Sequence, residues 1–317
     1  MMSVEQLPLF PGEPPQTVSP HADLTPDTSL SAAMERFRVH MIQQEYAENT
    51  VKSFLGDLRI LKRYLKGDPP VGQISTRKLQ DFLHWLLHER GKPCSPKSYA
   101  RRLTTLKVFF AWLADLGVLP ADPASPLVHK PVQVPLPRFL YDDQVDQVLA
   151  VTREMMEGQM SGKKPDPRPH LLVSLLLHTG VKKQECMGIK LAHIDTSNPA
   201  GPVVHIRYDN PRQRYKERGL RLPPAWARTL AQYRRIYEPQ EYLFPCTARN
   251  LEYVLASVAK QSGLPDGLSF EMLRWTCAVR DFQARMDPDR LRRKLGLSQM
   301  SWQETEPKLV RLAAPPL

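Results

Sequence analysis

The chain has 317 residues, enough for two domains that each bury a core without disulfide or metal support. Apolar residues make up 42% of it, typical of a folded protein, and its longest apolar run near a helix, Leu171 to Leu177, is too short to cross a membrane. The formal net charge is +11, and residues 1–28 hold four acids and no lysine or arginine, which leaves +15 for the rest. This excess favours a polyanionic partner, above all nucleic acid, over a basic surface that contacts only solvent.

Cysteine usage and the N-terminal residues indicate a cytoplasmic protein. No lysine or arginine precedes Arg36 and no apolar block precedes it, so we expect no secretory signal. The cysteines are scattered and form no CxxC pair, which argues against a zinc ribbon, an iron–sulfur site or a disulfide framework. They are Cys94, Cys186, Cys246 and Cys277.

Proline clusters divide the chain. Six prolines fall in residues 1–28 and six in residues 120–137. Proline removes a backbone donor and blocks a continuing helix, so both stretches are predicted to be extended. We therefore predict a disordered tail over residues 1–28, a helical domain over 29–118, a linker over 119–137 and a second domain over 138–317.

The first domain carries four patterns of apolar residues at helical spacing, which predict a small all-helical bundle. The predicted helices begin around Met34, at Thr50, at Ser75 or Thr76, and at Ser95 followed by Pro96. The second and fourth helices carry basic residues off their apolar faces, which we interpret as contacts to DNA phosphates rather than as solvated helix faces. These residues are Lys52, Arg59, Lys62, Arg63, Lys97, Arg101, Arg102 and Lys107.

The second domain is predicted to be mainly helical with a small antiparallel sheet. The expected strands are Val203–Tyr208 and Gly219–Leu222, and a basic hairpin turn joins them. Its charges favour contact with a DNA backbone over a solvated turn; the bases are Arg212, Arg214, Lys216 and Arg218. Helices are expected over Tyr141–Met155, Leu171–His178, Pro224–Tyr237, Ala248–Ser262, Phe270–Ala284 and Asp287–Leu295.

The order of these motifs resembles the tyrosine recombinase (phage integrase) family over about residues 28–310. The bundle resembles the family's core-binding, SAM-like domain, and five segments of the remaining chain resemble the boxes of its catalytic domain. Those segments are Leu136–Asp143 (linker end), Leu175–Asp195 (first arginine), Lys216–Arg218 (lysine hairpin), Leu268–Val279 (second arginine) and Leu295–Gly296 (start of the nucleophile box).

This resemblance implies a mechanism without a metal or cofactor. In the family, a tyrosine hydroxyl attacks the scissile DNA phosphate and forms a phosphotyrosine link. Two arginines grip the non-bridging oxygens, a hairpin lysine protonates the leaving oxygen, and two histidine or tryptophan positions assist.

Carried over residue by residue, most of these positions are substituted. Only the second arginine is retained, as Arg274; the other positions fall on Lys182 (first arginine), Gln213 (lysine), Glu271 (histidine), Leu297 (histidine or tryptophan) and Glu306 (nucleophile). The last histidine is His205 and the last tyrosine is Tyr253, so no shift of alignment supplies the missing groups.

The remaining charges allow two interpretations each. Glu271 lies three residues before Arg274, a helical spacing that lets it occupy the guanidinium fork, so Arg274 either is structural or binds phosphate. Lys182 and Lys183 either contact a phosphate or form a solvated helix end. Lysine keeps the charge of an arginine but loses its planar fork.

We therefore expect a protein that binds double-stranded DNA and has lost strand cleavage, acting beside an active recombinase or associating with itself on DNA. The first alternative is a divergent active recombinase whose nucleophile is Tyr208, Tyr215 or Tyr253, or comes from a partner chain. The second is a protein-interaction scaffold without DNA binding, which the charge of the chain argues against.

Overall fold

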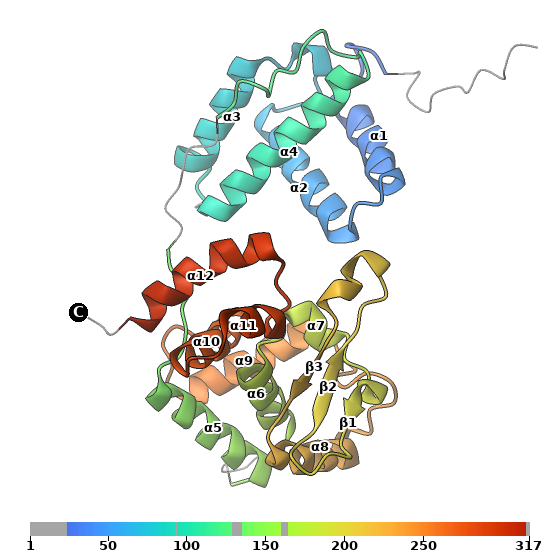
Figure 1. Cartoon of the computed structure of the whole chain (residues 1–317). Helices are drawn as coiled ribbons and strands as arrows, with labels where there is room; N and C mark the ends of the chain where they lie inside the picture. The colour runs from blue at the N-terminus through green and yellow to red at the C-terminus, as the bar shows by residue number, and fades with distance from the viewer. Residues whose placement is uncertain (1–23, 93, 129–134, 160–163, 315–317) are drawn as a thin grey trace, which may run out of the picture. The chain divides into compact units, whose positions relative to one another are not determined.

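A computed structural model gives the fold, and the chain separates into two compact units, Met1–Val134 and Pro135–Leu317 (Figure 1). Each is described by itself, over residues 24–92, 94–128, 135–159 and 164–314. The architecture is mainly α-helical with one small antiparallel sheet, as the sequence predicts. In the described part of the chain, no helix is both long enough and apolar enough to cross a membrane.

Four α-helices form the first unit: α1 Leu30–Gln43, α2 Glu48–Tyr64, α3 Thr76–His88 and α4 Pro96–Asp115. Ser75 and Ser95 cap α3 and α4 as predicted, each accepting a backbone N–H of the first turn. The predicted start at Thr50 is wrong, because α2 begins at Glu48. An acid in the first turn suits the positive end of the helix dipole, and Glu48 also pairs with Lys52.

α4 buries two stripes of residues rather than one. The predicted stripe, which includes Leu103 and Leu106, is buried, and so is a second stripe containing Arg102, Thr105 and Phe109. Helix α4 packs against both α2 and α3, so one apolar face cannot satisfy all its contacts. The expectation that Arg102 lies off the buried face is therefore wrong.

Segments assigned to the tail and the linker also pack on this bundle. The N–H of Gly72 donates to the carbonyl of Pro26 at 2.8 Å, so the predicted disorder does not hold for residues 24–28. At the other end, Leu119, Ala124 and Leu127 are buried in the same core. The remainder of the predicted tail, residues 1–23, and residues 129–134 of the linker lie outside the described residues.

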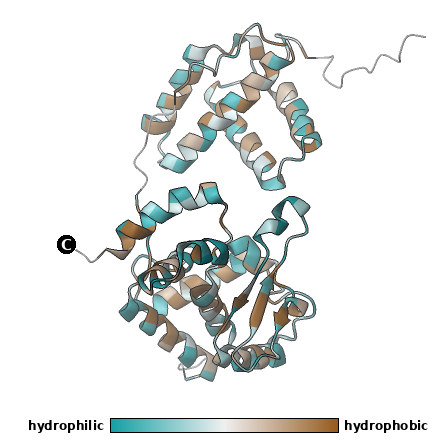
Figure 2. Ribbon diagram, viewed as in Figure 1, coloured by the Kyte–Doolittle hydropathy of each residue, from teal (hydrophilic) through white to brown (hydrophobic). Residues whose placement is uncertain are grey.

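Helices α5 to α12 and a three-stranded sheet make up the second unit. The helices are α5 Asp142–Glu157, α6 Arg168–Thr179, α7 Lys183–Met187, α8 Pro224–Tyr237, α9 Ala248–Gln261, α10 Phe270–Gln283, α11 Pro288–Lys294 and α12 Gln299–Ala313. Helix α6, almost wholly buried, lies in contact with α5, α8, α9 and α10 at the centre of the core, whose apolar residues stand out in Figure 2.

The sheet has the order β1-β2-β3, with β1 Ile194–Asp195, β2 Val203–Ile206 and β3 Arg218–Arg221 all antiparallel to their neighbours. Strand β1 is absent from the sequence prediction, since two residues carry no readable alternation. The expected strand to Tyr208 stops at Ile206, because the N–H of Tyr208 donates to the carboxylate of Glu217 instead of to β3.

Gly56, in the interior of α2, has open space around it: a Cβ atom there would meet nothing within 4 Å. We expect Gly56→Ala to stabilise the chain by about 0.5–1 kcal/mol, because alanine loses less backbone entropy in a helix. Thermal unfolding followed by circular dichroism measures the gain. Gly117, equally open but at φ +72°, is the matched control: Gly117→Ala should destabilise. A loss of stability in Gly56→Ala would contradict the helix assignment.

Candidate functional site

A pocket of about 660 Å³ lies in the second unit, bordered by α7, α9, α10 and the segments before and inside α12. Five of the sequence-predicted site residues line it: Lys182, Lys183, Glu271, Arg274 and Leu297. Within the described part of the unit, Gln213 and Glu306 are not among its lining residues. We call this cavity the site pocket.

Arg274, which the family resemblance predicts to be the second arginine, projects from α10 toward two backbone carbonyls. Its Nη1 donates to the carbonyl of Gly180 and its Nη2 to that of Leu295, the latter at 2.7 Å. One of the two interpretations above has Glu271 in this fork, whereas both terminal nitrogens donate to backbone oxygens. Burial lowers the pKa of the Arg274 guanidinium, and the charge of Glu185 opposes that shift.

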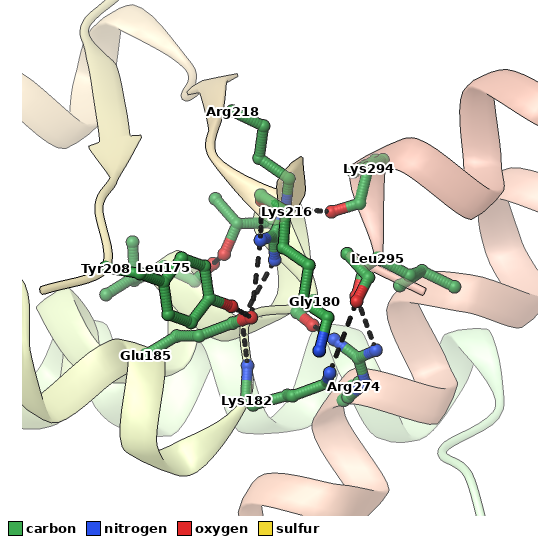
Figure 3. A network of polar contacts seen from close by, with 12 residues as sticks. Leu175, Gly180, Lys182, Glu185, Tyr208, Lys216, Arg218, Arg274, Lys294 and Leu295 are labelled. Carbon is green, nitrogen blue, oxygen red and sulfur yellow. Dashed lines mark hydrogen bonds and ion pairs between the residues drawn. The ribbon is translucent and has the colours of Figure 1, made fainter. Parts of the chain in front are cut away.

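Three successive backbone carbonyls at the end of α11 each accept a hydrogen bond from a different cation, and Figure 3 labels Lys294 and Leu295 among them. The Lys294 oxygen accepts from Arg218 Nε at 2.7 Å, the Leu295 oxygen from Arg274 Nη2 at 2.7 Å, and the Gly296 oxygen from Lys182 Nζ at 3.3 Å. The C-terminal carbonyls of a helix lack helical donors and carry partial negative charge. We call these six residues the carbonyl cluster, in which the cations of the site cap a helix end.

Lys182, onto which the family resemblance places the first arginine, is the N-cap residue of α7. Its half-buried ammonium has a pKa below the ordinary lysine value, because burial disfavours the charge and Arg274, Lys216 and Arg218 add repulsion, while Glu185 opposes the shift. The Lys182 ammonium donates to one carbonyl here, whereas an arginine guanidinium would offer two parallel donors.

Glu185 is the acid at the centre of the polar network. Its carboxylate accepts from Arg218 Nη2 at 2.8 Å, from the backbone N–H of Lys182 at 2.8 Å and from the hydroxyl of Tyr208. The side chains of Glu185 and Arg218 are only 2% and 9% exposed. Arg218, expected to contact DNA from the hairpin, is instead buried in this ion pair, which ties β3 to α7.

Glu271 is exposed in the first turn of α10, where Ser269 caps the helix by accepting the N–H of Met272 at 3.1 Å. The N-terminus of a helix attracts an anion, and here the chain supplies its own carboxylate. Glu271 therefore adds negative charge at the mouth of a pocket that, in the implied mechanism, receives a phosphate.

Position 306 lies inside α12, directly before Pro307. Glu306 is half-buried there, and its neighbour Thr305 lines the site pocket instead. The hydroxyl of Thr305 donates to the carbonyl of Ser301 at 2.7 Å. Sequence reasoning predicted neither Thr305 nor the helix that holds it.

None of the three alternative tyrosines lines the site pocket as residues 135–159 and 164–314 form it. Burial and the hydrogen bond to Glu185 raise the pKa of Tyr208 to about 12, which makes it a poor nucleophile. Tyr215 is 68% exposed on the hairpin. Tyr253 accepts from Arg249 Nε at 2.7 Å and borders a separate pocket of about 390 Å³.

The basic residues predicted to meet DNA differ in exposure. Those exposed on α2 and α4 are Lys52, Arg59, Arg63, Lys97 and Arg101, and those exposed in the second unit are Lys183, Arg212 and Arg214. Lys62, Lys107, Lys182 and Lys216 are half-buried, and Arg102 and Arg218 are nine-tenths buried. Three of the exposed bases form ion pairs with acids: Lys52 with Glu48, Arg101 with Asp57 and Lys183 with Glu252. Lys97 and Arg212 have interaction partners as well.

Solved structures place this fold among the DNA recombinases and integrases. The integrase of the Tn1549 transposon, in complex with a circular intermediate DNA, superposes with a TM-score of 0.68 at 17% identity, over 93% of this chain and 96% of that chain. A lambda integrase dimer bound to a COC′ core site gives 0.67 at 14% identity, over 90% and 78%. The fold is therefore that of a tyrosine recombinase.

Sequence comparison leads to the same family. Residues 34–117 match the family model described as phage integrase, N-terminal SAM-like domain. Tyrosine recombinase XerC of Lacticaseibacillus casei is 24% identical over 271 residues, covering 82% of this chain and 88% of the relative. That of Mycobacterium leprae is 31% identical over 167 residues, 52% and 54% of the two chains. The relatives that match this chain, over most of its length or over half of it, are thus tyrosine recombinases.

Proposed function

We propose that this protein binds double-stranded DNA in recombination or integration but does not cleave strands itself. It would serve in the cytoplasm as an accessory or regulatory subunit, either beside an active recombinase or with copies of itself on DNA. The carbonyl cluster is the observation that carries the proposal. In it, Lys182, Arg218 and Arg274 donate hydrogen bonds to backbone oxygens, which compete with a phosphate for the same donors.

The chemistry of cleavage supports an inactive site. Loss of one donor to the transition-state oxyanion typically costs about 10²–10³ in rate, and loss of a general acid about 10²–10⁴. Under the family resemblance, the first arginine falls on Lys182, the lysine on Gln213 and the nucleophile on Glu306. An ionised carboxylate is repelled by a phosphodiester, so Glu306 cannot take over the attack.

Covalent trapping tests this proposal. The full chain is incubated with nicked duplexes of randomised sequence, and protein–DNA adducts are resolved on a denaturing gel. We expect no adduct from the unmodified chain, and none from Glu306→Tyr alone, because the phosphate clamp and the acid are still missing and Glu271 still opposes an anion. An active tyrosine recombinase with its own nicked site is the positive control.

A fuller variant separates a lost site from a lost fold. It combines Lys182→Arg, Gln213→Lys, Glu271→His, Leu297→His and Glu306→Tyr. If this variant forms the adduct and the unmodified chain does not, the fold still supports the cleavage reaction once the catalytic side chains are restored. Adduct from the unmodified chain would overturn the proposal in favour of a displaced nucleophile, and adduct that appears only with a second recombinase would favour one supplied in trans.

A further inference from the structure

A second buried acid, Asp57, lies in the first unit and plays no part in the site pocket. It projects from α2 toward α4 and its side chain is 3% exposed. Arg101 donates to it twice, from Nε at 2.9 Å and from Nη2 at 2.7 Å, and the hydroxyl of Thr105 donates at 3.2 Å. The carboxylate therefore holds one edge of the Arg101 guanidinium in a bidentate pair.

A second arginine approaches the same acid from the interior. Arg102 Nε lies 3.4 Å from the Asp57 carboxylate, and Arg102 Nη1 lies 2.7 Å from the sulfur of Cys94. Arg102 is buried, whereas the side chain of Arg101 is 44% exposed. Asp57 thus has an inner partner that offsets its charge in the core and an outer partner that reaches the surface.

Stability alone does not account for this arrangement. Replacing a buried ion pair by apolar residues of similar volume is often neutral or stabilising, so such a pair is weak evidence of a stabilising role. The pair fixes the orientation of the Arg101 guanidinium, because Nε and Nη2 of Arg101 both donate to the Asp57 carboxylate. The opposite edge, formed by Nη1 and the second hydrogen of Nη2, faces away from the acid, and Nη1 has no partner among the described residues.

We propose that Asp57 is a positioning residue that presents Arg101, already oriented, to a backbone phosphate of duplex DNA. A guanidinium binds phosphate through two parallel N–H donors, and Arg101 keeps such a pair free after binding Asp57. Lys97 and Thr104, also exposed, lie on the same face of α4 at helical spacing. This inference rests on the proposed DNA binding of the chain and adds the residue that prepares one contact.

The positioning is tested first without DNA, by ¹⁵N relaxation at the Arg101 Nε–H group in the full chain. We expect an order parameter near 0.8 for the unmodified chain and below about 0.6 for Asp57→Asn, since the freed side chain would sample several rotamers. Equal values in both proteins would overturn the positioning role, whatever the chain does with DNA.

The contact is tested by the affinity for a labelled duplex in a double-mutant cycle. Arg101→Ala should weaken binding about tenfold or more, and Asp57→Asn about three- to tenfold, because the freed arginine must be ordered on binding. In the Arg101→Ala background, Asp57→Asn should change affinity less than about twofold. Equal losses in both backgrounds would show that Asp57 acts through another route and overturn the inference.

Two further variants complete the design. Glu35→Gln is the matched control, since it removes a carboxylate from the exposed Arg38 and should leave DNA affinity unchanged.

Arg101→Lys retains the inner pair of Asp57 with Arg102 and is used if Asp57→Asn fails to fold. It should keep the salt dependence yet bind at least threefold more weakly, and unchanged affinity would overturn the inference. If the unmodified chain does not bind duplex DNA, the proposed function itself fails, together with the DNA contact of Arg101.

Discussion

Raising the salt concentration from about 50 to about 200 mM is expected to weaken the binding of this chain to duplex DNA about 10⁴-fold. Each phosphate that a lysine or arginine neutralises releases condensed counterions, so the logarithm of the affinity falls by about 0.9 per contact for each decade of salt. Eight contacts give a slope of about −7. The exposed bases of α2, α4 and the hairpin, together with Lys183 of α7, number eight and are sufficient for such a set.

Fluorescence anisotropy of a labelled duplex over a salt series measures the slope. Arg59→Ala and Arg63→Ala, at exposed positions of α2, should each reduce its magnitude by about one and leave the melting temperature unchanged. Affinity that does not respond to salt would exclude phosphate contacts as the source of binding. Absence of binding at low salt would favour the scaffold interpretation.

Glu185→Ala is expected to destabilise the chain by about 3–5 kcal/mol, because it leaves Arg218 buried without a counter-charge. The variant also removes the acceptor for the Lys182 N–H and for the Tyr208 hydroxyl. For a unit of this size, the loss corresponds to a fall of roughly 10 °C in melting temperature. Thermal and urea unfolding of the full chain, followed by circular dichroism, measure it.

The same variant has a predicted pH dependence. Burial alone would raise the pKa of Glu185, but the hydrogen bond and charge of Arg218 hold it below its ordinary value. The stability this acid contributes is therefore present at neutral pH and is lost as the pH falls through that lowered pKa. The difference in stability between the variant and the unmodified chain should begin to shrink only below the ordinary glutamate pKa of about 4.3.

Glu241→Ala is the control for that experiment, since it breaks the exposed pair with Lys190 and should cost less than about 1 kcal/mol. If Glu185→Ala and Glu241→Ala unfolded at the same temperature, the central place of Glu185 in the polar network would be wrong.

The fold is readable from the sequence, because motif order and helical spacing survive low identity. Helix caps at Ser75 and Ser95 carry local signals and are confirmed. The burial of Arg102 and Arg218 could not be predicted in this way, because a sequence-based prediction assigns a charged residue to the surface unless its ion-pair partner is known. Their partners Asp57 and Glu185 lie in other elements, 45 and 33 residues away, which no local pattern reveals.

Two parts of the site escape sequence reasoning for a physical reason. The acceptors of the carbonyl cluster are backbone oxygens, which every residue type carries, so no pattern of residue types in the sequence predicts the cluster. Helix α12 contains Pro307, which interrupts helical hydrogen bonding and argues locally against a helix. Its buried Trp302 and Leu309 pack against α10 and α11, and this tertiary contact outweighs the local preference.

The carbonyl cluster changes what the survival of Arg274 means. By joining α10 to the turn after α6 and to the end of α11, this arginine contributes to folding as well as to any chemistry. The fold therefore requires this arginine whatever the chain does to DNA. Its presence alone is not a sign of strand cleavage, because a folded protein of this architecture that only binds DNA needs the same two contacts.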